Sequence, residues 1–214
     1  MSFIKVFEPF RVYRKLESDE HICIFADPAE GVDYCAAVGI SKKFNDTPIV
    51  FNERIESGQF GHELYHMAKY VEQRTHLWPT IGVERNTGQA TIYVLVTLNY
   101  HDMFRMKIFD SSTSKESDKL GWLTTEPTRK KMLDDLALAI RQEQLKIYDR
   151  EIVDQLRAFV VAKRGRAQAE SGKKDDLVMA LAGAYQVSIL TPEKEADEFD
   201  IESWRKEQVK WRFR

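Results

Sequence analysis

The first half of the chain contains short apolar segments that are typical of buried strands. Residues 21–27 are almost all apolar, which is the pattern of a central strand covered on both faces. Residues 32–40 and 47–55 are rich in β-branched and aromatic side chains, and the polar stretch between them predicts a hairpin-like pair. Residues 79–84 resemble the first segment and predict a further buried strand.

Helical spacing appears between these strands and dominates after them. Leu64, Met67, Ala68 and Val71 follow one another at helical intervals, which predicts an amphipathic helix that ends near residue 74. Further helices are predicted at residues 89–98, 126–144, 151–159 and 175–189. The remaining segments are a predicted strand at 103–109, a polar and mobile segment at 110–119, and an extended segment or basic hairpin at 160–171.

The order of these elements predicts an α/β fold. A helix lies between the strands at 21–27 and 79–84, and a strand–helix–strand connection of this kind makes the two strands parallel. A chain of 214 residues, of which 43% are hydrophobic, can bury one good core. We therefore expect one domain at residues 21–190, preceded by a lead-in or edge element at 1–20 and followed by a charged tail at 191–214.

Composition excludes several classes of protein. No apolar segment reaches the roughly 18 residues that span a bilayer, and the N-terminus has no signal-peptide pattern, so we expect a soluble intracellular protein without a membrane partner. Cys23 and Cys35 lack metal-binding spacing, which predicts reduced core thiols. The net charge of −2 argues against a protein that coats DNA through a general basic field.

Acidic residues stand where a buried core should disfavour them. Asp27 and Glu84 end two apolar strands, and Asp175 with Asp176 opens the last helix. Acids at a helix N-terminus also serve as caps and dipole partners, so the pair has two interpretations. The carboxyl ends of neighbouring parallel strands meet at one edge, where the last helix can complete a cluster. Oxygen ligands favour Mg²⁺ or Mn²⁺, and such a cluster predicts two-metal phosphodiester hydrolysis.

Basic residues are densest just before the last helix. Because acids repel a phosphate backbone, we expect this run to contact DNA phosphates; the alternative is a solvated surface. The run consists of Lys163, Arg164, Arg166, Lys173 and Lys174.

Short motifs surround these acids in a specific order. They are Phe-Ala-Asp27-Pro-Ala-Glu-Gly31 with Asp33, Val-Glu84-Arg-Asn86, Gly121-Trp-Leu-Thr-Thr with Arg129, and Gly-Lys-Lys-Asp175-Asp176-Leu-Val-Met-Ala-Leu181. Together they resemble the nuclease domain of the large terminase subunit of tailed bacteriophages, over about residues 20–190. The resemblance implies a ribonuclease H/resolvase-like fold, a mixed sheet of about five strands flanked by helices.

The resemblance also implies roles for the acids. Asp27 matches the metal-bridging acid of the first strand, Glu84 the acid that ends the fourth strand, and Asp175 with Asp176 the acid of the last helix. We favour Asp176 as the direct ligand of two Mg²⁺ or Mn²⁺ ions, with Asp175 beside it. Asp33 matches an additional acid of some relatives, or is an ordinary turn acid. Lys174 stands where many relatives have histidine.

The implied activity is endonucleolytic cleavage of concatemeric viral double-stranded DNA during genome packaging in the host cell cytoplasm. The implied partners are this DNA, the portal, the small terminase subunit and a packaging ATPase domain. The phosphate-binding pattern Gly-x-x-x-x-Gly-Lys-Ser/Thr does not occur, so we expect no ATPase activity and regard residues 1–20 as the remains of a connection to such a motor. The alternatives are a junction resolvase or transposase-type nuclease and a non-catalytic module that binds DNA or the portal.

Overall fold

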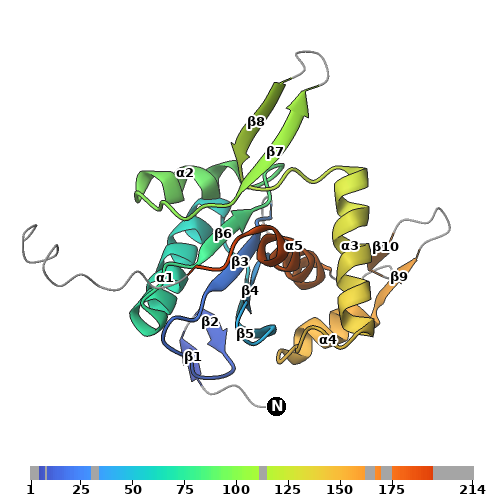
Figure 1. Ribbon diagram of the computed structural model, residues 1–214, viewed down its shortest axis with the longest axis horizontal. Coiled ribbons are helices and arrows are strands. Elements are labelled where there is room, and N and C mark those ends of the chain that lie inside the picture. The colour runs from blue at the N-terminus through green and yellow to red at the C-terminus, as the bar shows by residue number, and fades with distance from the viewer. Residues whose placement is uncertain are drawn as a thin grey trace, which may run out of the picture.

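A six-stranded mixed sheet forms the centre of the described part of the protein (Figure 1). The structure is a computed structural model that describes residues 5–7, 9–29, 34–110, 115–161, 167–169 and 175–194. The strands of this sheet are β1 (Lys5–Phe7), β2 (Phe10–Val12), β3 (Ile22–Asp27), β4 (Cys35–Ser41), β5 (Asp46–Glu53) and β6 (Thr80–Val83). Their order is β1-β2-β5-β4-β3-β6, and only β3 and β6 pair in parallel. The predicted mixed α/β sheet is confirmed, with the β1–β2 hairpin as its edge element.

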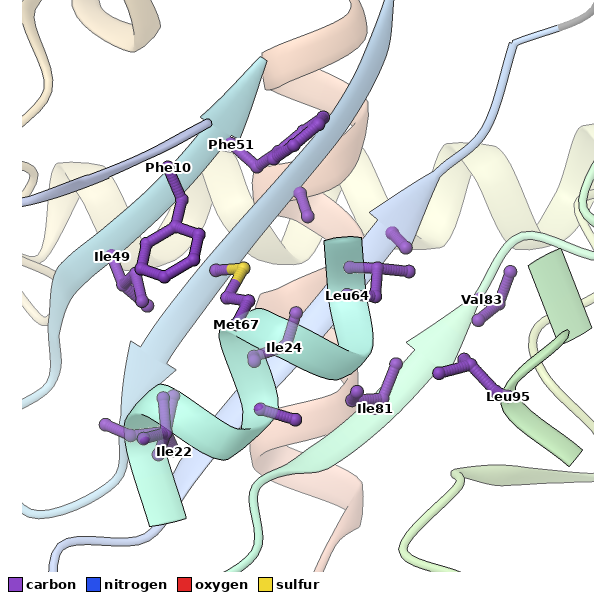
Figure 2. Packing of buried hydrophobic residues seen from close by; sticks show 14 of the residues in the cluster. Phe10, Ile22, Ile24, Ile49, Phe51, Leu64, Met67, Ile81, Val83 and Leu95 are labelled. Atoms are coloured by element: carbon purple, nitrogen blue, oxygen red, sulfur yellow. The ribbon is translucent and has the colours of Figure 1, made fainter. Parts of the chain in front are cut away.

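Helices cover both faces of this sheet. They are α1 (Ser57–Thr75), α2 (Gln89–Thr97), α3 (Glu126–Arg141), α4 (Arg150–Arg157) and α5 (Asp176–Leu190). Alternate residues of β3 face opposite sides, as the strand period of two requires. Ile22 and Ile24 pack with Leu64 and Met67 of α1 in one apolar cluster (Figure 2). Phe25 belongs to the cluster on the other face, together with buried residues of α3, α4 and α5.

Helix α5 lies unusually close to the strand that carries Asp27. A β-carbon added at Gly183 would lie 2.2 Å from the ring of Phe25, so only glycine permits this approach. A β-carbon added at Gly82 of β6 would likewise lie 2.6 Å from the side chain of Val187. These two contacts fix α5 against β3 and β6, and they hold the start of α5 near the carboxyl ends of both strands.

Two smaller hairpins lie outside the main sheet. Strand β7 (Arg105–Asp110) pairs with β8 (Lys115–Leu120), and β9 (Phe159–Val161) pairs with β10 (Ala167–Ala169), both antiparallel. The second pair confirms the hairpin interpretation of residues 160–171. In the polar segment 110–119, which is predicted to be mobile, residues 115–119 form part of strand β8, which the sequence pattern does not predict. With β7 it forms a hairpin that projects from the body of the protein (Figure 1). Because the strand is held by backbone hydrogen bonds and not by burial of one face, its sequence lacks the apolar alternation from which a strand is predicted.

The helices predicted from the sequence are all present, with shifted ends. The first begins at Ser57, earlier than its apolar pattern, and α3 ends at Arg141, before the predicted end at residue 144. In the described part of the chain, none of the helices has the combination of length and apolar character needed to cross a bilayer.

Candidate active site

The carboxyl ends of β3 and β6 bring Asp27 and Glu84 to the same edge of the sheet. Asp27 is the last residue of β3, and Glu84 directly follows β6. The parallel register pairs Ala26 with Val83, and the backbone N–H of Glu84 donates to the carbonyl oxygen of Ala26 at 2.9 Å. The prediction that these acids end adjacent parallel strands is confirmed.

Thr87 holds the Glu84 carboxylate in place. Glu84 is only 7% exposed, and its Oε2 atom accepts a hydrogen bond from the backbone N–H of Thr87 at 2.9 Å. The hydroxyl of Thr87 lies 3.1 Å from the same Oε2 atom and 2.7 Å from the carbonyl oxygen of Pro28. A hydroxyl has one proton to donate, so it serves one of these acceptors at a time. Either way, Thr87 connects the Glu84 carboxylate with the segment that follows Asp27.

The segment before α3 closes the outer side of β6. The backbone N–H of Trp122 donates to the carbonyl of Val83, and that of Arg85 donates to the carbonyl of Trp122, both at 2.8 Å. Asn86 adds a side-chain bond to the carbonyl of Thr124 at 2.7 Å. Thr125 then caps α3 in a reciprocal capping box, and the first turn of this helix contains Arg129. The motifs that follow one another in the sequence thus form one connected layer beside the acids.

Asp175 and Asp176 mark the start of α5. Asp175 occupies the N-cap position, yet its side chain makes no capping hydrogen bond. Its Oδ2 atom instead accepts from Nη2 of Arg129 at 3.2 Å. The N–H of Leu177 is satisfied by Oε1 of Gln155, a residue of α4, at 3.0 Å. Asp175 therefore does not cap α5 through its side chain, whereas Asp176 remains an acid of the first helical turn.

The acids converge closely enough to change the ionisation of Asp27. Desolvation by the surrounding protein raises the pKa of the Asp27 carboxyl well above its usual range. The negative charges of Glu84, Asp176 and Asp175 raise it further, in that order, while the positive charge of Arg129 acts against them. Asp27 keeps some exposed surface, so a ligand can approach it. Asp27 and Glu84 thus lie at this edge, and Asp175 and Asp176 lie close enough to act on Asp27 electrostatically. We call these four acids the acid edge.

The present side-chain positions do not form a finished metal site. Among the described residues, no group of three or more His, Cys, Asp or Glu side chains is arranged to hold a metal ion. Hydrogen bonds explain this arrangement. Glu84 and Asp175 each turn a carboxylate oxygen toward a donor of the protein, Thr87 and Arg129 respectively, and not toward a common cation position. The donor chemistry nevertheless fits a hard divalent cation, which prefers carboxylate oxygens. Binding by these acids requires side-chain movement.

Some predicted site residues cannot be placed, and some residues of the site were not predicted. Asp33, Lys163, Arg164, Arg166, Lys173 and Lys174 lie outside the described residues. Thr87 and Gln155 carry no sequence signal for their roles, because a threonine in a turn and a glutamine within a helix are ordinary. Arg129 was visible only as part of a motif.

Solved structures with a similar fold include nuclease domains of phage large terminases. The large terminase nuclease of thermophilic phage G20c has a TM-score of 0.65 and 17% identity, over 86% of this chain and 90% of its own. Its form with bound magnesium also has a TM-score of 0.65 and 17% identity, over 86% and 89%. The Thermus phage P74-26 nuclease domain has a TM-score of 0.57 and 18% identity, over 87% and 90%. No protein-family model and no curated protein sequence matches the chain.

Proposed function

The chain has the fold of large terminase nuclease domains, and we propose that it acts as a metal-dependent endonuclease that cleaves concatemeric viral double-stranded DNA during genome packaging. The observation that carries this proposal is the convergence of Asp27, Glu84, Asp175 and Asp176 at the carboxyl ends of two parallel strands. Ligands of open α/β sheets collect at such ends. A group of acids that raises the pKa of one member is typical of a site that recruits cations or performs acid–base chemistry.

We propose Asp27, Glu84 and Asp176 as ligands of two Mg²⁺ or Mn²⁺ ions, with Asp175 as a further acid of the site. Such ions, when bound, supply an activated water molecule and stabilise the leaving oxygen of the phosphodiester. The phage G20c nuclease has been solved with magnesium, cobalt and zinc, which supports binding of a divalent cation here. In this chain Thr87 would orient the Glu84 carboxylate, and Gln155 would hold the first turn of α5.

Contacts with DNA phosphates are proposed for Lys163, Arg164 and Arg166, which lie between β9 and β10 in the sequence, and for Lys173 and Lys174, which precede α5. Asp33 remains a proposed additional acid. The portal, the small terminase subunit and a packaging ATPase domain are the proposed partners, and the host cell cytoplasm is the proposed location.

Cleavage of plasmid DNA tests the proposal. The protein should nick or linearise plasmid with Mg²⁺ or Mn²⁺ and should be inactive with chelator. Asp27→Asn and Glu84→Gln should each lower the cleavage rate by at least about 100-fold, the scale on which a site loses an electrostatic group. Asp134→Asn is the matched control, because Asp134 is a 62% exposed acid of α3 that pairs with Lys130.

Each contrary result has a distinct meaning. Cleavage in the presence of chelator, or full activity of Glu84→Gln, would contradict the metal-dependent site. DNA binding without cleavage by the wild type would favour the non-catalytic binding module. Faster cleavage of a four-way junction than of linear duplex would favour a junction resolvase.

A further inference from the structure

Among the residues that the structure describes, Arg129 forms an ion pair with one acid of the acid edge, Asp175. It lies in the first turns of α3, and its Nη2 atom is 3.2 Å from Oδ2 of Asp175. The side chains of the pair are only 15% and 33% exposed. The guanidinium also lies 6.0 Å from the ring centroid of Phe159 in β9, at the outer limit of a cation–π contact. Arg129 thus extends from α3 to the side chain of Phe159 in β9 and to Asp175 at the start of α5.

We propose that Arg129 is a built-in counter-charge of the acid edge, which competes with divalent cations and lowers the affinity of the site for them. This inference rests on the proposed function, because it assumes that the acids bind cations. It makes Arg129 a positioning residue, since it acts on the carboxylates and not on the substrate.

The described charges at the acid edge are unevenly balanced. Asp27, Glu84, Asp175 and Asp176 repel one another, and Arg129 is the cation that opposes their combined effect on the pKa of Asp27. A guanidinium stays protonated throughout the physiological pH range, so this compensation is permanent. The negative potential at the site is therefore partly neutralised before a divalent cation binds, which lowers the attraction of the site for that cation.

The ion pair adds a direct competition. The Oδ2 atom of Asp175 is occupied by Arg129, and the described acids do not yet surround a cation. A cation that takes Oδ2 of Asp175 as a ligand would have to displace the Nη2 atom of Arg129. Cation binding and the Arg129–Asp175 pair thus oppose each other.

A purely structural role for Arg129 predicts the opposite sign. If the residue only fastened α3 to α5, its removal would loosen the start of α5 and weaken cation binding. If it is a counter-charge, its removal should make the site more negative and strengthen cation binding. The direction of the change in affinity therefore separates the two roles without any measurement of nuclease activity.

Isothermal titration calorimetry of the full chain with Mn²⁺, after removal of metals with chelator, provides the test. We expect Arg129→Gln to bind Mn²⁺ about three- to tenfold more tightly than the wild type, the scale of one unit charge acting at intermediate dielectric. Lys130→Gln is the matched control: it removes the same charge from the next residue, whose side chain is 75% exposed, and should leave the affinity unchanged. Arg129→Lys keeps the charge and should bind within about twofold of the wild type.

Unchanged or weaker Mn²⁺ binding by Arg129→Gln overturns the inference, as does an equal gain in Lys130→Gln. If Arg129→Gln does not fold, Arg129→Lys decides: affinity close to that of the wild type supports a counter-charge, and a loss of more than about threefold contradicts it. If the wild type binds no Mn²⁺, the proposed function itself fails. If the wild type binds Mn²⁺ and cleaves DNA but Arg129→Gln does not bind more tightly, only the counter-charge is wrong.

Discussion

Two groups of charged side chains lie at opposite ends of β3, and they differ in how their charges are balanced. At the N-terminal end, Arg14 donates to both carboxylate oxygens of Asp46 at 2.7 Å and to Glu20 at 3.1 Å. Tyr148 adds a hydrogen bond to Asp46 at 3.0 Å. We call these residues the Arg14 network. Glu20 is fully buried and Asp46 is 2% exposed, yet each has a charged partner.

Among the described residues, the acid edge at the C-terminal end of β3 also has one cation, but it has four acids where the Arg14 network has two. Burial and the charges of Glu84, Asp176 and Asp175 raise the pKa of Asp27, and Arg129 acts against them. Paired and hydrogen-bonded charges hold a fold in one geometry, whereas clustered like charges oppose folding until a ligand compensates them. The difference between the two ends fits a stabilising role for the Arg14 network and the proposed cation-binding role of the acid edge.

The largest expected effect on stability comes from breaking the Arg14 network. Arg14→Ala would leave Glu20 and Asp46 buried without their cation, so the free energy of unfolding should fall by about 3–5 kcal/mol. Urea denaturation followed by circular dichroism measures this. Lys43→Ala is the control, because it breaks the exposed pair with Glu17 and should change stability by less than about 1 kcal/mol. Equal effects of the two substitutions would contradict the distinction between paired buried charges and surface charges.

The acid edge should respond with the opposite sign. In the presence of chelator at neutral pH, Asp27→Asn should raise the free energy of unfolding by on the order of 1–3 kcal/mol, because it removes a partly buried acid whose charge is desolvated and repelled by neighbouring acids. The folded-state pKa of Asp27 lies above its unfolded value, so the native state retains the proton longer than the unfolded state. Wild-type stability should therefore fall as the pH rises from the unfolded pKa to the folded one.

Denaturation curves at several pH values test this sign. The difference between Asp27→Asn and wild type should grow with pH across that interval and level off above it. Excess Mg²⁺ should then stabilise the wild type more than the variant, since a ligand of the native state adds to stability. If Asp27→Asn were less stable than the wild type at every pH, charge repulsion at the acid edge would not destabilise the folded protein.

The two ends of β3 also differ in how far the sequence could predict them. Asp27 and Glu84 follow apolar strands, and the rule that parallel strands end at one edge brings them together from sequence alone. The Arg14 network joins residues 14, 20, 46 and 148, whose spacing has no periodicity and whose contact depends on the path of two loops. Gln155 likewise reaches the start of α5 only through the packing of α4. Strand periodicity is a local property of the sequence, whereas the partners of polar side chains depend on the tertiary fold.

Packing beneath the acid edge gives a third prediction. Gly183→Ala places a methyl group 2.2 Å from the Phe25 ring and should destabilise the protein by about 1–3 kcal/mol, the usual effect of overpacking. It should also shift the start of α5 and lower cation affinity. Gly58→Ala is the matched control in α1, where nothing lies within 4 Å of the added carbon, and helix propensity predicts a small gain in stability. Thermal unfolding without Mn²⁺ measures the change in stability, and the shift on addition of Mn²⁺ measures the change in cation affinity. If Gly183→Ala and Gly58→Ala behaved alike, the close approach of α5 to β3 would be needed neither for stability nor for cation binding.

The smallest expected change in stability concerns the orientation of one acid. Thr87→Val keeps the shape of the side chain and the backbone bond to Glu84 but removes the hydroxyl, which lies near both Oε2 of Glu84 and the carbonyl of Pro28. The free energy of unfolding should fall by about 0.5–1.5 kcal/mol, the net contribution of one hydrogen bond. The cleavage rate should fall by about 10–100-fold, because residues that orient metal ligands have effects of this size.

Thr97→Val is the matched control. It removes a hydroxyl that donates to the carbonyl of Tyr93 on the exposed side of α2, so it should change neither the stability nor the cleavage rate. Mn²⁺ affinity, cleavage rate and stability are measured on both variants. If Thr87→Val lost stability without any change in Mn²⁺ affinity or cleavage, Thr87 would support only the loop after β3, and the Glu84 carboxylate would be oriented at the acid edge without the Thr87 hydroxyl.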